Sequence, residues 1–108
     1  MRERHTRPKR IKARSAKALI GQDGAILVDV RTPPEYAAGH IAGAVLLPLD
    51  TLTQGAQTAL PDNGAHVIVY CQSGARSARA AKQLADLGFS NVHDLGGIIS
   101  WPYGIERG

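Results

Sequence analysis

The sequence contains one cysteine, Cys71, which is followed by four small or polar residues and then by Arg76. A lone thiol forms no intramolecular disulfide, so it is either a small buried hydrophobic residue or a nucleophile. Cys71 ends the apolar run 66–70 and precedes a helical pattern, which places it at the carboxyl end of a buried strand. Ligands bind at that end of the strands in open α/β sheets. This context favours the nucleophile.

The loop after Cys71 has a composition suited to holding an anion. It consists of Gln72, Ser73, Gly74 and Ala75, before Arg76. Such a chain curls so that backbone N–H groups face one point, and the N-terminus of the following helix adds positive potential there. Both effects favour the thiolate, without a Cys–His pair. Arg76 is either an exposed arginine at a helix start or a fork that holds an anionic substrate or the loop carbonyls.

Apolar runs of strand length alternate with helical patterns along the chain. The predicted strands are 25–30, 44–47, 66–71 and 92–95, and the predicted helices are 15–22, a short one from Pro34 to Gly39, 51–60 and 77–87. Runs 25–30 and 66–71 are apolar at nearly every position, as in strands buried on both faces of a parallel sheet. We therefore expect an α/β fold with helices on both faces of a central, mostly parallel sheet.

The net charge of +4 is concentrated at the N-terminus, because residues 1–17 carry +7 and the remaining residues carry −3. We expect residues 1–14 to form a basic, flexible arm and residues 15–108 to form the domain. An acidic protein is a candidate partner for the arm, whereas nucleic acid is disfavoured because the arm has no aromatic residues. No apolar run approaches the ~20 residues of a membrane span, and no signal segment is recognisable. With the single cysteine, this predicts a cytoplasmic protein that does not associate with membranes.

Four segments, in order, resemble motifs of the rhodanese-type sulfurtransferases. Segment 71–77 (CQSGARS) is similar to the active-site loop of that family, and segments 29–36 (DVRTPPEY), 39–44 (GHIAGA) and 96–101 (GGIISW) are similar to its other motifs. The match covers about residues 25–101. It implies a single-domain rhodanese with a three-layer α/β fold and no metal or organic cofactor.

The resemblance also implies a reaction. Cys71 would take the outer sulfur of thiosulfate or of a persulfide donor, and an acceptor such as cyanide or a thiol would remove it. The loop from Gln72 to Arg76 would bind that sulfur, and its length implies sulfur transfer, since rhodanese-fold phosphatases have one more residue. Gln72 stands where many thiosulfate-using relatives have Arg or Lys, so thiosulfate is expected to be attracted less. After Trp101 the family pattern is lost, so the entrance near the C-terminus is expected to differ.

Supporting roles are expected for Asp29, Arg31 and His40. In this family, residues such as Asp29 and Arg31 hold loops together, and Glu35 is a candidate ion-pair partner of Arg31. His40 is expected to bond a neighbouring backbone group. The His and Cys residues show no metal-ligand spacing, so we expect no metal site. The alternative to an enzyme is a rhodanese-fold interaction or redox-sensing module that delivers sulfur to one partner.

Overall fold

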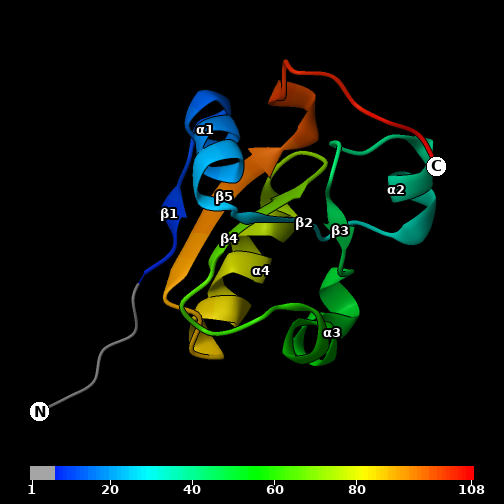
Figure 1. Cartoon of the computed structure of the whole chain (residues 1–108). Helices are drawn as coiled ribbons and strands as arrows, with labels where there is room; N and C mark the ends of the chain where they lie inside the picture. Colours follow the sequence, from blue (N-terminus) through cyan, green and yellow to red (C-terminus); the bar gives the residue numbers. More distant parts are fainter. Residues whose placement is uncertain (1–6) are drawn as a thin grey trace, which may run out of the picture.

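Five parallel strands form the centre of the structure, a computed structural model that describes residues 7–108 (Figure 1). Their order across the sheet is β1-β5-β4-β2-β3. The strands are β1 (Lys9–Arg10), β2 (Ile26–Asp29), β3 (Val45–Leu46), β4 (His66–Cys71) and β5 (Asn91–Gly97). Because the two most apolar runs, β2 and β4, lie in the interior of the sheet, the predicted α/β fold with a parallel sheet is confirmed.

Alternate residues of β4 enter two separate cores. Val67, Val69 and Cys71 pack in the core beneath α3 (Leu52–Ala59) and α4 (Ala75–Asp86). Ile68 and Tyr70 pack in the core on the other face, beneath α1 (Ala13–Asp23). Successive side chains of a strand point to opposite faces, so a strand covered on both sides must be apolar throughout. This explains why β4 shows no polar alternation.

The helices agree with the sequence pattern apart from their ends. The turn η1 (Leu49–Thr51) precedes α3, and α2 (Pro33–Ala38) lies beyond β3 (Figure 1). Helix α4 ends as its sequence predicts, because Gly88 has a φ of +103°. The Phe89 N–H donates to the Leu84 carbonyl at 3.1 Å and the Gly88 N–H donates to the Ala85 carbonyl at 3.0 Å, as in a Schellman motif. Helix α4 begins at Ala75 rather than Ser77, since Gly74 is its N-cap residue.

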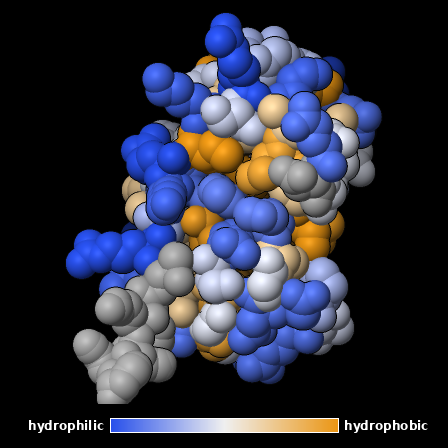
Figure 2. All heavy atoms as spheres, turned by 60° about the vertical axis from the view of Figure 1, so that its left-hand side comes forward, coloured by the Kyte–Doolittle hydropathy of each residue, from blue (hydrophilic) through white to orange (hydrophobic). Residues whose placement is uncertain are grey.

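Part of the basic N-terminal segment belongs to the sheet. Lys9 and Arg10 form β1, which pairs with β5 opposite His93 and Asp94, and α1 begins at Ala13. Figure 2 shows this side of the molecule, where hydrophilic side chains cover much of the surface. Residues 1–6 of the expected arm lie outside the described residues. None of the helices in the described part is long and apolar enough to cross a membrane.

The C-terminal segment folds back over α2. After η2 (Ile98–Ser100) the chain runs to α2 (Figure 1), where His40 and Glu106 exchange two backbone hydrogen bonds of 2.7 Å. The Gly108 N–H then donates to the Ala37 carbonyl at 2.9 Å. These contacts hold the last residues of the chain beside the carboxyl ends of the strands.

Candidate active site

Cys71 is the last residue of β4, and its side chain lies at the start of the loop that leads into α4. The residue is only 1% exposed. The Gly74 N–H donates to the Cys71 Sγ atom at 3.0 Å, and α4 begins at the next residue. A sulfur atom in this position receives a backbone hydrogen bond and lies beside the positive end of a 12-residue helix. Both interactions direct positive partial charge at the sulfur atom.

Two glycines let the loop curl against β5. Gly74 has a φ of +114°, a backbone conformation that other residues rarely adopt. Gly97 lies opposite Cys71 in the sheet, and a Cβ atom there would lie 2.5 Å from the Gln72 carbonyl oxygen and 2.9 Å from the Ser73 Cα atom. Only glycine at position 97 lets the loop approach this closely. The second glycine of the G-G pair therefore shapes the loop from the neighbouring strand.

A buried hydrogen-bond network holds the backbone of Gly74 in place. The Ser77 hydroxyl lies 2.7 Å from Asp94 Oδ1 and 3.0 Å from the Gly74 carbonyl oxygen. The same Asp94 oxygen accepts the Gly96 N–H at 3.0 Å, at the point where the pairing of β4 and β5 shifts register. Ser77 is fully buried and Asp94 nearly so. The network ties the bulge of β5 to the residue that donates to the sulfur.

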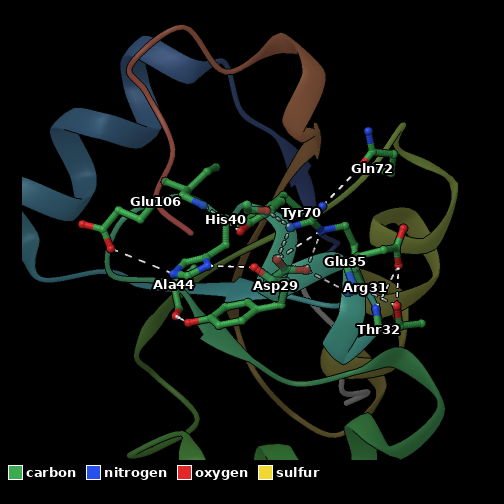
Figure 3. A network of polar contacts seen from close by, with 12 residues as sticks. Asp29, Arg31, Thr32, Glu35, His40, Ala44, Tyr70, Gln72 and Glu106 are labelled. Atoms are coloured by element: carbon green, nitrogen blue, oxygen red, sulfur yellow. Dashed lines mark hydrogen bonds and ion pairs between the residues drawn. The ribbon is translucent and has the colours of Figure 1, made fainter. Parts of the chain in front are cut away.

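Arg31 joins the end of β2 to the loop (Figure 3). It forms a buried ion pair with Asp29, with an Nη2–Oδ2 distance of 2.7 Å. Its Nη2 also donates to the Gly39 carbonyl at 2.7 Å, and its Nη1 donates to the Gln72 Oε1 atom at 3.1 Å. The expected ion pair between Arg31 and Glu35 is wrong. The Arg31 guanidinium instead donates hydrogen bonds to the carboxylate of Asp29, two residues earlier in the sequence.

Glu35 instead pairs with Arg76. The two Arg76 terminal nitrogens donate to the two Glu35 carboxylate oxygens at 2.7 and 2.9 Å, and both side chains are 32% exposed. This bond, together with hydrogen bonds from Thr32, lowers the pKa of Glu35 to about 2. The same contact raises the pKa of Arg76. The guanidinium fork of Arg76 is thus occupied by a carboxylate of the protein.

His40 and Tyr70 support the floor of the site. His40 Nδ1 lies 2.9 Å from the Tyr36 carbonyl oxygen, and the two rings stack with centroids 3.7 Å apart. The Tyr70 hydroxyl accepts the Ile41 N–H at 3.1 Å, and burial raises its pKa. The Tyr70 hydroxyl thus ties Ile41 of the G-H-I segment to β4, and the His40 contacts tie the segment to α2. Within residues 7–108, no three His, Cys, Asp or Glu side chains gather to hold a metal ion.

Two hollows on the surface reach the loop, and Ile99 contributes to the lining of both. One, of about 510 Å³, has a largely apolar wall and reaches Gln72; its lining includes Arg31, Glu35, Gln72, Ile98, Ile99, Trp101 and Ile105. The other, of about 520 Å³, has a basic wall and reaches Ser73 and Gly74; its lining includes Arg10, Lys12, Ala13, Asp94 and Ser100. The two hollows therefore differ in charge.

The structure brings together most residues that the sequence singled out. Arg31 links Asp29 to Gln72, whereas His40 contacts the neighbouring α2 and the C-terminal segment. The sequence reasoning missed Ser77 and Asp94 as parts of the site. The signal for Asp94 was an acidic residue inside a predicted strand, because a carboxylate that becomes buried there requires a polar partner.

The protein is thus an α/β protein with a parallel sheet, and its cysteine lies between a central strand and the N-terminus of a helix. Residues 12–102 match the family described as the Rhodanese-like domain, and the chain belongs to this family.

Named relatives and a solved structure agree with this assignment. The chain is 42% identical over 94 residues to the thiosulfate sulfurtransferase GlpE of Pseudomonas entomophila, a match that covers 86% of this chain and 84% of GlpE. It is 37% identical over 71 residues to the thiosulfate sulfurtransferase PspE of Escherichia coli, covering 66% and 68% of the two chains. The structure of the human single-domain sulfurtransferase TSTD1 superposes with a TM-score of 0.77 at 26% identity, covering 85% of this chain and 93% of that one.

Proposed function

We propose that this protein is a sulfurtransferase that carries a sulfane sulfur on Cys71. The observation that carries the proposal is the position of Sγ, which accepts the Gly74 N–H at the N-terminus of α4. A thiolate is the nucleophilic form of cysteine, and a negative sulfur is stabilised at this point by the backbone. The thiosulfate sulfurtransferase names of GlpE and PspE support the same chemistry.

The reaction has two halves. The Cys71 thiolate attacks the outer sulfur of thiosulfate or of a persulfide; a sulfur–sulfur bond to Cys71 forms, and the donor's own bond to that sulfur breaks. Sulfite, or the donor thiolate, leaves with the electron pair, and Cys71 becomes a persulfide anion. An acceptor thiolate or cyanide then attacks the outer sulfur, and the Cys71 thiolate leaves unchanged. Backbone N–H groups of the loop would stabilise both the Cys71 thiolate and the Cys71 persulfide anion.

Mass spectrometry of the intact protein tests the proposal. After treatment with thiosulfate or an organic persulfide, we expect a gain of about 32 Da that cyanide removes and that Cys71→Ala abolishes. A protein that gains no sulfur from either class of donor would refute the proposal. A persulfide that forms but is not passed to small acceptors would instead support a module that delivers sulfur to one protein partner.

A further inference from the structure

Three of the four large apolar side chains that are strongly exposed in residues 7–108 line, or lie next to, the apolar hollow that reaches Gln72. In the part of the chain that the structure describes, four are strongly exposed: Ile99 at 72%, Ile105 at 52%, Tyr103 at 43% and Val45 at 40%. Ile99 and Ile105 line the apolar hollow that reaches Gln72. Tyr103 packs edge-on against Trp101, which also lines it, with ring centroids 5.0 Å apart. Such clustering marks a binding surface more often than chance.

Specific contacts within the chain hold the wall of the apolar hollow in place. Ile105 is fixed by the backbone bridge between His40 and Glu106, next to it in sequence. A Cβ atom at Gly39 would lie 2.8 Å from the Ile105 Cδ1 atom, so this side chain rests directly on the glycine. The C-terminal segment thus supplies one wall of the hollow, and η2 supplies the opposite wall with Ile98 and Ile99.

The charged groups of this hollow neutralise one another. Arg31 is paired with Asp29, and Glu35 is paired with Arg76. Gln72 contributes an uncharged amide whose oxygen already accepts a hydrogen bond from Arg31 (Figure 3). An anion that enters this hollow meets apolar walls and paired charges, so a small dianion gains little there in exchange for its hydration. The other hollow is lined by Arg10 and Lys12, which form no ion pair with another residue of the described part of the chain.

We propose that the hollow bounded by Gln72, Ile99, Trp101 and Ile105 binds the apolar group of an organic sulfane donor, in preference to thiosulfate. The inference rests on the proposed function and names the substrate class for the same cysteine. With a thiosulfonate, R–SO₂–S⁻, the Cys71 thiolate takes the outer sulfur, the donor's sulfur–sulfur bond breaks and the sulfinate R–SO₂⁻ leaves with the electron pair. One negative charge remains on the Cys71 persulfide, so atoms and charge balance.

A series of three donors tests the inference: benzenethiosulfonate, methanethiosulfonate and thiosulfate. The first two have the same charge and the same reacting group, and they differ in the apolar group. Burial of about 60 Å² more apolar surface, at about 25 cal/mol per Å², predicts that kcat/KM for the benzene compound exceeds that for the methane compound about tenfold. Each rate is divided by the rate of the same donor with 2-mercaptoethanol, which removes differences in intrinsic reactivity.

Matched variants locate the effect. We expect Ile105→Ser to lower the benzene-to-methane ratio, because it removes an apolar side chain that lines this hollow and not the basic one, and that is already exposed to solvent and outside the core. Val45→Ser is the control, since Val45 is also exposed but lies on β3 outside the hollow. We expect this variant to keep the ratio of the unmodified protein.

Two different failures are distinguishable. If no donor loads sulfur onto Cys71, the proposed function itself is refuted. If all three donors load it but the normalised benzene-to-methane ratio is near one, or thiosulfate is the best donor, only the inference about the hollow is refuted. A high ratio that Ile105→Ser leaves unchanged also refutes it, because the apolar group then binds elsewhere.

Discussion

The ion pair between Glu35 and Arg76 can be tested by a substitution that removes the charge of Glu35 and keeps the shape of its side chain. Glu35→Gln keeps the length of the side chain and its acceptor oxygen for the Thr32 N–H, which is bonded at 3.0 Å. Glu and Gln serve equally in such a capping box. The substitution therefore removes the negative charge that faces Arg76 while α2 keeps its N-terminal cap.

The structure sets the size of the expected effect on stability. A fall in the pKa of Glu35 from 4.5 to about 2 corresponds to at most about 3 kcal/mol, since one pKa unit is worth ~1.4 kcal/mol. Both side chains are 32% exposed, and solvent screening reduces the contribution of such pairs. We expect Glu35→Gln to lower the free energy of unfolding at neutral pH by about 1–2 kcal/mol, between the values typical of exposed and buried pairs.

The pH dependence gives the stricter test. Because the folded state lowers the pKa of Glu35, its stabilising effect is fully present above pH 4.5 and is lost as the pH falls towards 2. Urea denaturation at several pH values should show the two proteins converging over that range. Asp86→Asn, which breaks an exposed pair with Lys82, is the control and should change stability little. A difference that stays constant down to pH 2 would contradict the assigned charge effect.

The same variant changes the chemistry in a defined direction. Without the Glu35 carboxylate, the Arg76 guanidinium is free to bind an anion near the loop. Under the proposed function, kcat/KM for thiosulfate should rise in Glu35→Gln relative to that for benzenethiosulfonate, which carries less charge. Stopped-flow loading of Cys71 measures both. An unchanged ratio would show that Arg76 does not face the bound donor.

Three further predictions concern positions near the loop and β5. Gly97→Ala should lower the free energy of unfolding by about 1–3 kcal/mol, because its Cβ would lie 2.5 Å from the Gln72 carbonyl oxygen. The displaced loop should also slow the alkylation of Cys71 by iodoacetamide, whereas unchanged stability would mean that the loop moves freely. Ser77→Ala should cost about 1–3 kcal/mol by leaving buried Asp94 without its hydroxyl partner, whereas Ser90→Ala, which removes an exposed hydrogen bond, should cost little. His93→Gln should reduce the loss of stability below pH 6.5. Burial, followed by the charges of His66 and Lys9, lowers the pKa of His93 in the folded protein, so the unfolded chain binds the proton more readily. If the free energy of unfolding depends on pH equally in the variant and the unmodified protein, this prediction is wrong.

The sheet was predictable from the sequence because its strands carry their own signal. The apolar runs that became β2 and β4 are buried on both faces, and Gly88 marks the end of α4. The strand β1 was not predictable, since Lys9 and Arg10 are charged and exposed and owe their conformation to the edge of β5. An edge strand of charged residues has no hydrophobic pattern to detect.

The loop was predictable in its residues but its surroundings were not. The position of Cys71 follows from local order in the chain, whereas the partners of Arg31 and Arg76 depend on how α2 lies relative to the loop. Two arginines and two carboxylates allow more than one pairing, and only the fold selects between them. The roles of the individual loop residues, the cytoplasmic location and the acidic partner of the 1–14 arm stay predictions.

The pairing of both arginines changes what can stabilise sulfur at Cys71. In the described part of the chain, Arg31 and Arg76 each face a carboxylate, whereas the sulfur accepts the Gly74 N–H at the start of α4. Backbone dipoles are fixed in direction and do not titrate, and they act on a thiolate and a persulfide anion alike. Under the proposed function, a site of this kind needs no positively charged side chain to hold the persulfide. The choice of donor is then left to the walls around the loop, which is where Gln72 and the exposed isoleucines lie.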